Sequence, residues 1–404
     1  HSRSESLAME YNPFDTKTQD DPYPTYKWLR DEAPVYHNEE LDIWALSRFE
    51  DVFAATTDPE SFSNDLMFGG AGGVEQPFSQ FLFSDGVTHA RERVMVSKWF
   101  TPRRIAAWEP RVREVAQQLL DPLMGRGECD IIQDFAARFP MALISELMGI
   151  PEADRDTVRH WSDDFLARDP GNPDPPERAV KANAALAEYF LAAREERRRQ
   201  PREDLLTVLS NMETPHEDGV HPLADGHYVG NCQLLVIAGN ETTTKLIANA
   251  VLQLHRHRDQ REDLIEHPDA IPNAVEETLR YDAPSQWQNR RVAREVTLHG
   301  VTIPENAFCG LLTGAACRDE RRYPDPDRYN VRRDVGMHLA LGWGRHLCLG
   351  KALARLEGKV ALEEILTRFP GYEVDESGLK RVYVTNVAGY CEMPISYEPG
   401  ARGE

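Results

Sequence analysis

Apolar residues recur at helical spacing along most of this chain and alternate with polar residues only in short stretches. From residue 88 to about residue 199 the pattern predicts helices, interrupted by a loop at 169–176, because its prolines cannot continue a helix. Alternation at 34–37 and 43–47 predicts a pair of strands. A glycine-rich loop is expected between residues 63 and 84.

The longest helical pattern covers residues 225–258 and would span roughly 50 Å at about 1.5 Å per residue. Its middle, residues 232–238, is apolar nearly all round, which predicts a helix that runs through the core. Further helices are expected at 271–281 and 351–369, and short strands at 293–308, 381–384 and 393–397.

These patterns predict a mainly α fold, with a large helical region around the long central helix and a smaller β-rich region. The β-rich region is expected to be built from both ends of the chain. No strong linker divides the sequence, so a single domain is expected over residues 9–404. Residues 1–8 precede Met9 and are interpreted as a remnant of cloning.

Composition and charge narrow the class of protein. The 404 residues carry a formal net charge of −21, which argues against nucleic acid as a partner because phosphate binding needs a basic surface. No apolar run reaches about 18 residues, so membrane insertion is not expected. The six cysteines form no CxxC pair and no disulfide framework, which favours a reducing, cytoplasmic location.

An acid and two hydroxyls follow a glycine in the middle of the long helix, in the stretch from Ala238 to Thr243. Glycine disfavours a helix interior by about 1 kcal/mol relative to alanine, and threonine hydroxyls that bond to the backbone bend helices. Two interpretations remain open. The stretch is either a kink with an incidental polar patch or an opened turn beside a reactive centre, where Glu241 and Thr242 relay protons.

A second charged pattern is the pair Glu277 and Arg280, which share a helix face and can form an ion pair. Arg328, in a rigid proline-rich segment, could join Glu277 in a bidentate contact. A surface ion pair and a solvated loop arginine are the alternatives.

A third pattern could bind an anion. His89 and Arg93 lie four residues apart and share a helix face, so both side chains could contact one anion. Arg291 could add another contact. Solvated surface positions are the alternative for all three residues.

The stretch LGWGRHLCLG, residues 341–350, places Cys348 among three glycines. Packing, nucleophilic catalysis and metal ligation are its conceivable roles. A nucleophile would need an oriented histidine base, for which His346 shows no signature, and zinc would need three or four ligands. One thiolate suits a metal that brings its own other ligands, as haem does. Glycines would let the backbone approach the ring and point N–H groups at the sulfur.

Taken together, these motifs resemble the cytochrome P450 superfamily in its soluble bacterial form, over nearly the whole chain from about Asn12 onward. The family's haem loop is F-G-x-G-x-H-x-C-x-G. Nine of its ten positions agree with residues 341–350, and the first carries Leu341 in place of phenylalanine.

The resemblance implies a haem-thiolate monooxygenase that uses haem b (iron protoporphyrin IX) and takes dioxygen as co-substrate. Cys348 would be the axial iron ligand, and Glu241 with Thr242 would be the acid–alcohol pair that delivers protons. The structural salt-bridge triad would consist of Glu277, Arg280 and Arg328. The other cofactor-binding residues would be His89, Arg93, Ala238, Gly239, Arg291, Gly342, His346 and Gly350.

The implied reaction hydroxylates or epoxidises a mostly hydrophobic small molecule, such as a terpenoid, steroid, fatty acid or polyketide of secondary metabolism. The expected pocket residues are Leu235, Ser285, Gln286, Trp287, Gln288, Asn386 and Val387, although the side chains from Ser285 to Asn289 could equally point away from the cavity. Electrons are expected from a ferredoxin or flavodoxin with its reductase, because no flavin- or nicotinamide-binding motif is present. A monomer is expected. A peroxide-driven peroxygenase and a non-catalytic haem-binding protein are the alternatives.

Overall fold

The computed structural model describes residues 9–65, 80–216, 219–384 and 386–400. The proposed cloning remnant, residues 1–8, and most of the expected glycine-rich loop, residues 66–79, lie outside the described residues.

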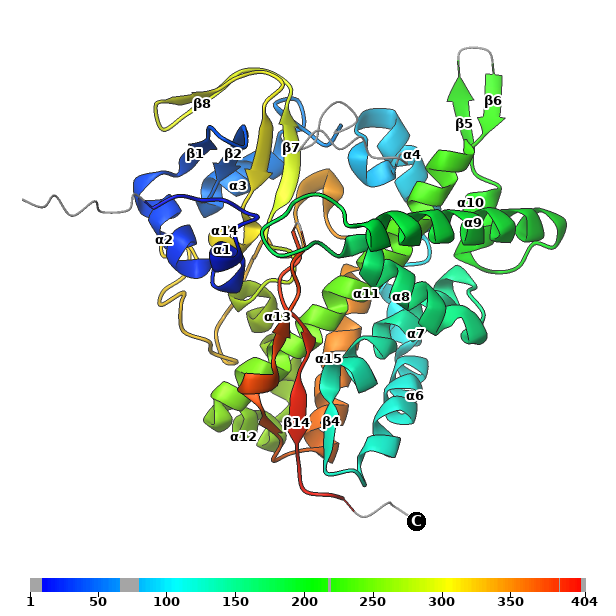
Figure 1. The fold of residues 1–404 in the computed structure, drawn as a ribbon, viewed down its shortest axis with the longest axis vertical. Coiled ribbons are helices and arrows are strands. Elements are labelled where there is room, and N and C mark those ends of the chain that lie inside the picture. Colours follow the sequence, from blue (N-terminus) through cyan, green and yellow to red (C-terminus); the bar gives the residue numbers. More distant parts are fainter. Residues whose placement is uncertain (1–8, 66–79, 217–218, 385, 401–404) are drawn as a thin grey trace, which may run out of the picture.

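A five-stranded sheet forms the core of the smaller β-rich region (Figure 1). Its strands, in spatial order, are β1 (Val35–Asn38), β2 (Ile43–Leu46), β10 (Phe308–Leu311), β7 (Gln288–Val292) and β3 (Phe62–Ser63). The predicted strands β1 and β2 pair with each other and are antiparallel. β10 lies parallel to β2 and antiparallel to β7. All four residues of β10 are buried, so no alternation marks this strand in the sequence.

The remaining strands form short ribbons at the edges of the fold. The segment 293–308, predicted as strands with a turn, contains the hairpin of β8 (Val296–Leu298) and β9 (Val301–Ile303). The predicted strand at 393–397 corresponds to β14 (Pro394–Ser396), whereas β12 (Lys380–Arg381) overlaps the predicted strand at 381–384 only at Arg381. The other strands are β4 (Glu128–Asp130), β5 (Glu213–His216), β6 (Gly219–Pro222), β11 (Glu373–Val374) and β13 (Tyr390–Glu392).

Helices make up the larger region, which confirms the mainly α prediction. Those of the first half of the chain are α1 (Thr16–Asp20), α2 (Tyr23–Glu32), α3 (Phe49–Thr57), α4 (Gly86–Ser97), α5 (Pro102–Ala107), α6 (Glu109–Leu120), α7 (Arg138–Met148), α8 (Arg155–Leu166) and α9 (Glu177–Arg199). The others are α10 (Leu205–Ser210), α11 (Asp225–Arg256), α12 (Arg258–Glu266), α13 (Ile271–Tyr281), α14 (Thr313–Ala316) and α15 (Lys351–Arg368). None of the helices in the described part of the chain has the length and apolarity that a membrane span requires.

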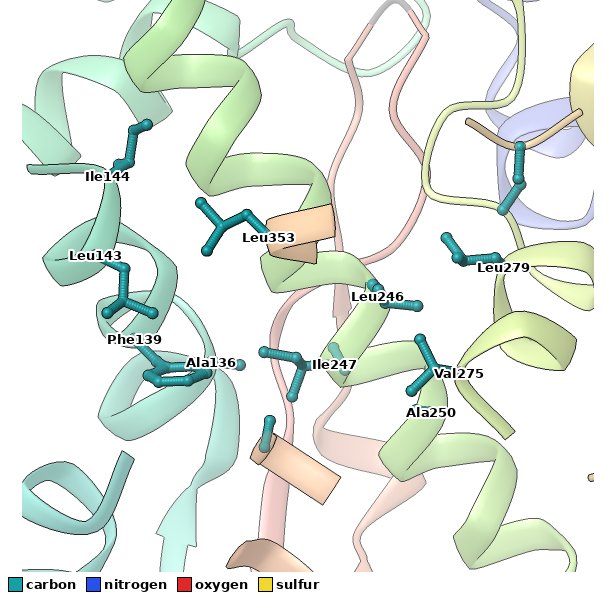
Figure 2. Packing of buried hydrophobic residues seen from close by; sticks show 14 of the residues in the cluster. Ala136, Phe139, Leu143, Ile144, Leu246, Ile247, Ala250, Val275, Leu279 and Leu353 are labelled. Carbon is teal, nitrogen blue, oxygen red and sulfur yellow. The ribbon is translucent and has the colours of Figure 1, made fainter. Parts of the chain in front are cut away.

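The central helix α11 is 32 residues long and crosses the middle of the molecule (Figure 1). Figure 2 shows Leu246 and Ile247 of α11 among apolar side chains from α7, α13 and α15. α7 approaches α11 closely, since a Cβ at Gly239 would lie 2.8 Å from Cγ1 of Ile144. This packing holds the middle of α11 in a fixed position.

Candidate functional site

Three residues interrupt the burial of α11 near its middle. Ala238 is exposed and Gly239 and Thr242 are half-buried, whereas every other residue from 235 to 254 is buried. Ala238 and Thr242 lie one turn apart on the same face. The Thr242 hydroxyl donates to the Ala238 carbonyl at 2.9 Å, so its oxygen can still accept a hydrogen bond from a molecule on this face.

Glu241 is adjacent to Thr242 in sequence but lies on a different face of α11. Its carboxylate is buried, and Oε1 lies 2.8 Å from Nζ of Lys245, one turn further along. Adjacent helix residues do not face each other, so this acid and this hydroxyl are not in contact. α11 is α-helical throughout the segment. Of the two interpretations, the opened turn is therefore not observed, and the Thr242 hydroxyl bonds to the backbone within a continuous helix.

A tight loop presents the thiol of Cys348. The Cys348 N–H donates to the Leu341 carbonyl at 2.8 Å and closes the loop. Gly342 and Gly344 have φ angles of 69° and 68°, a left-handed conformation that favours glycine. Cys348 is half-buried, and α15 begins three residues later at Lys351.

The surroundings of Cys348 act on the charge of its sulfur in two directions. Burial raises the pKa of the thiol above its usual range. The N–H of Gly350 and the positive charges of Arg93, Arg355 and Lys351 act in the opposite direction and favour the thiolate. A cation at the sulfur would add to this stabilisation, since a coordinated thiol loses its proton.

A group of side chains beside this loop is suited to hold carboxylates. The imidazole rings of His89 and His346 lie 4.1 Å apart between centroids. His89 Nε2 and His346 Nδ1 are buried, and neither has a hydrogen-bond partner among the described residues. The Arg93 guanidinium donates to the Leu347 carbonyl, which joins α4 to the Cys348 loop. A haem brings two carboxylates to such a thiolate, so the side chains present fit haem.

Asp85 belongs to the same group, although sequence reasoning missed it. Burial favours the neutral form of its carboxyl, but hydrogen bonds from His346, Ser63 and the Asn64 N–H outweigh burial and lower its pKa to about 2. Burial lowers the pKa of His89 to about 4, so this imidazole is neutral. The signal for Asp85 is its position as the residue preceding α4, the usual place of a helix-capping acid.

Among the described residues, Arg291 forms no hydrogen bond with His89, Arg93 or His346. Its Nε donates to the Asp65 carbonyl at 3.1 Å. The buried neighbour Arg290 instead lines a cavity with Asp85 and His346, because successive residues of a strand point to opposite faces. Cofactor binding by Arg291 therefore stays a prediction.

The predicted salt-bridge triad needs one correction. Glu277 and Arg280 are fully buried and form a bidentate pair at 2.7 and 2.9 Å. The prediction that Arg328 completes the group is wrong, because a turn at 325–328 leaves its side chain exposed. Arg333 occupies that position, with Nε 3.2 Å from the Glu277 carboxylate.

Removal of the Arg333 side chain is expected to destabilise the fold far more than removal of Arg328. Arg333→Ala would break a contact to a buried carboxylate and three hydrogen bonds to carbonyls, which we estimate at about 3 kcal/mol. Arg328→Ala should change the free energy of unfolding by less than about 0.5 kcal/mol. Urea unfolding of the haem-loaded protein measures both. Equal effects would contradict the assignment of Arg333.

The residues predicted for the substrate pocket fall into separate places. Four of them, Gln286, Trp287, Asn386 and Val387, line a cavity that is closed on its other side by residues of the amino-terminal segment. Trp287 is also buried in an apolar cluster with Tyr26 and Phe308, and its ring packs on Gly310. A role of Trp287 in substrate binding stays a prediction. Leu235 is buried on α11, one turn before Gly239. Ser285 pairs with Val387 in an isolated bridge, and the Gln288 amide lies beside Gly342 of the Cys348 loop.

Comparisons with known proteins agree with this arrangement. A family profile described as Cytochrome P450 matches residues 176–383. Cytochrome P450 123 of Mycobacterium tuberculosis is 42% identical over 398 residues, covering 96% of each chain. The 6-deoxyerythronolide B hydroxylase of Saccharopolyspora erythraea is 36% identical, covering 92% of this chain and 95% of that protein. The crystal structure of CYP109E1 from Bacillus megaterium in complex with testosterone has a TM-score of 0.84 at 30% identity, covering 95% and 99% of the two chains.

The fold and these relatives define a haem-dependent oxygenase. The chain belongs to the cytochrome P450 family. It is a monooxygenase that uses haem b and dioxygen.

Leu341 is the one departure from the family's haem loop, and Leu341→Phe is expected to shift the reduction potential of the haem. The Leu341 carbonyl accepts a hydrogen bond from the Cys348 N–H, so an aromatic ring at 341 would change the loop that presents the sulfur and the polarity around it. Redox titration measures the potential, and the carbon monoxide spectrum should stay unchanged because ligation is unaffected. An unchanged potential would refute this role of Leu341.

Proposed function

We propose that Cys348 binds the haem iron of this monooxygenase through its thiolate. The proposal rests on three features that occur together around this loop. The Cys348 sulfur is half-buried, and the Gly350 N–H and nearby basic side chains favour its negative charge. One ring nitrogen each of His89 and His346 is buried and has no hydrogen-bond partner among the described residues. When bound, haem activates dioxygen with two electrons, and one oxygen atom enters the substrate while the other leaves as water.

The residues around the thiol would position the cofactor. His89, Arg93 and His346 would hold the propionate carboxylates by hydrogen bonds from their ring and guanidinium nitrogens. Ala238 is exposed and carries only a methyl group, so a flat ring can lie close to α11 at this position. The space beside Gly239 is taken by Ile144 of α7, and cofactor binding by Gly239 stays a prediction. Thr242 would then present its hydroxyl to the reacting side, and Glu241 would resupply the proton that the hydroxyl passes on.

The proposed substrate is a mostly hydrophobic small molecule of polyketide or steroid type, which is hydroxylated. Two comparisons support this class: one relative is named 6-deoxyerythronolide B hydroxylase, and one similar structure holds testosterone. Terpenoids and fatty acids belong to the same range of apolar molecules. A small, largely apolar stripe at the middle of α11 is compatible with each of them.

Electrons would come from a separate ferredoxin or flavodoxin with its reductase, in the cytoplasm. Basic residues lie in α5, in the Cys348 loop and at the start of α15, namely Arg103, Arg104, Arg345, Lys351 and Arg355. Arg103 and Arg345 are exposed, whereas Arg355 forms an ion pair with Glu276 at 2.6 Å. A basic area on an acidic protein would attract an acidic donor protein.

One experiment tests the proposed function against its alternatives. The haem-loaded protein is mixed with macrolide lactones, steroids, terpenoids and fatty acids, and binding is followed by haem difference spectra. Binders are then incubated either with reduced ferredoxin, reductase and oxygen or with hydrogen peroxide alone. Product with the redox partners supports the proposal. Product formed only with hydrogen peroxide supports a peroxygenase. If reduction of the haem protein by ferredoxin causes no oxygen consumption, the protein binds haem without turnover.

A further inference from the structure

One carboxylate of α13 bridges the two ends of the Cys348 loop. Glu276 is adjacent to Glu277 in sequence but points in a different direction on the helix, and its partners are different. Its Oε2 lies 3.0 Å from Nε2 of His338, three residues before the loop. The same carboxylate accepts hydrogen bonds from Nε and Nη2 of Arg355 at 2.6 and 2.9 Å, five residues after the loop.

The two ends of the loop are themselves well defined. The histidine at the first end is buried, and the carbonyl of the next residue, Leu339, accepts from the Gly342 N–H at 2.9 Å in a tight turn. At the other end α15 packs against α13, where a Cβ at Gly358 would lie 3.1 Å from Cγ1 of Val275. Val275 precedes Glu276, so the bridging carboxylate projects from a fixed part of α13.

The bridge also carries charge. Burial favours the neutral form of the Glu276 carboxyl, but hydrogen bonds from His338 and Arg355 outweigh burial and lower its pKa to about 2. At neutral pH this carboxylate is therefore an anion that faces the guanidinium cation. Bidentate pairing of this kind fixes the geometry as well as the charge of both groups.

Arg355 lies close enough to the thiol to act on its charge. The Lys351 N–H donates to the Cys348 carbonyl at 3.4 Å, which joins the loop to the start of α15. Arg355 follows four residues later, about 6 Å along the helix axis, and helical side chains lean toward the amino terminus. Its positive charge favours the Cys348 thiolate, and the negative charge of Glu276 partly cancels this effect.

We propose that Glu276 is a positioning residue for the Cys348 loop and that, together with Arg355, it sets the reduction potential of the bound iron. The inference rests on the proposed function, in which Cys348 binds that iron. Reduction adds one negative charge at the iron and its ligands, so a nearby cation favours the reduced form and a nearby anion opposes it. Arg355 thus raises the potential, and Glu276 lowers it.

Redox titration of the haem-loaded protein tests this proposal. Glu276→Gln should favour the reduced form by about threefold, or roughly 30 mV for one electron. Arg355→Met should favour the oxidised form by a similar factor, and the double variant should return to near the wild-type potential. A pair that only stabilises the fold would shift both single variants in the same direction or leave both unchanged. Either result would overturn the proposal.

Two control variants make the titration specific. Arg355→Lys keeps the charge and should keep the potential. Glu364→Gln breaks a similar ion pair on α15, with Arg113 at 2.7 Å and Arg368 at 2.5 Å, nine residues beyond Arg355. It should lower the stability of the protein without moving the potential. A shift in Glu364→Gln as large as that in Glu276→Gln would refute the proposal, because lost stability alone would then explain both.

The position of the loop has its own readout in the iron–sulfur stretching band of the resonance Raman spectrum. The band should shift in Glu276→Gln and in His338→Phe, which release one or both ends of the loop, and it should stay in place in Glu364→Gln. An unchanged band in the first two variants would overturn the positioning role. If the wild type shows no thiolate-type absorption with carbon monoxide, the proposed function fails. If it does and the potentials do not move in opposite directions, only this inference fails.

Discussion

Cys348→Ala is expected to abolish the thiolate-type absorption of the reduced protein with carbon monoxide and to reduce product formation to background. Cys348 is the thiol that the loop 341–350 presents, and its charge is favoured by Gly350 and three basic residues. Without the sulfur no electron donation to iron remains, and oxygen activation depends on that donation. The carbon monoxide difference spectrum and a product assay measure the two effects.

Two further variants make this test specific. Cys348→His supplies another ligand and should retain haem while shifting the spectrum, which separates loss of the thiolate from loss of the fold. Cys129→Ser removes a half-buried free cysteine near β14 and should leave the spectrum unchanged. A wild-type spectrum in Cys348→Ala would show that another residue binds the iron.

Thr242→Ala is expected to leave substrate binding intact and to lower the product formed per reduced nicotinamide by about tenfold. Thr242 carries the hydroxyl on the unburied stripe of α11, and alanine preserves the helix while it removes this proton carrier. Electrons would then be consumed with release of peroxide in place of product. Simultaneous assays of nicotinamide, peroxide and product measure the coupling.

Thr242→Ser is the control for this prediction, because it keeps the hydroxyl and removes only a methyl group. It should restore coupling to near the wild-type ratio. If Thr242→Ala couples as efficiently as Thr242→Ser, the hydroxyl has no part in proton delivery, and the exposed stripe serves only to make room for the ring.

The sequence predicts the helices of this fold better than its central strands. Residues 271–281 were predicted as a helix and form α13 with the same bounds, because apolar positions at helical spacing face one core. β7 and β10 were not predicted as separate strands. Both lie inside the sheet. β10 is buried on two faces, which removes the alternation that reveals an edge strand such as β1. β7 has the sequence QNRRV, whose polar residues hide a strand that is only partly buried.

The candidate site shows the same division between local and tertiary information. The loop around Cys348 and the segment with Thr242 are local motifs, so the sequence is sufficient to find them. The partner of Glu277 depends on how two successive turns direct the chain, and the structure shows Arg333 where Arg328 was predicted. The contact of Asp85 with His346 spans 261 positions and leaves no mark in either local sequence.

The close approach of α7 and α11 at Gly239 links Gly239 to Ile144, two positions that are 95 residues apart. A chain with alanine at 239 must give up volume at 144, because the added methyl group would lie 2.8 Å from the Ile144 side chain. Among homologues these two positions should therefore covary, with glycine at 239 beside isoleucine at 144 and alanine at 239 beside alanine at 144, because valine would keep the nearest carbon, Cγ1. A mutant library that randomises residues of α11 alone would miss this constraint. Its variants with alanine at position 239 would be recovered only together with a smaller residue at position 144 of α7.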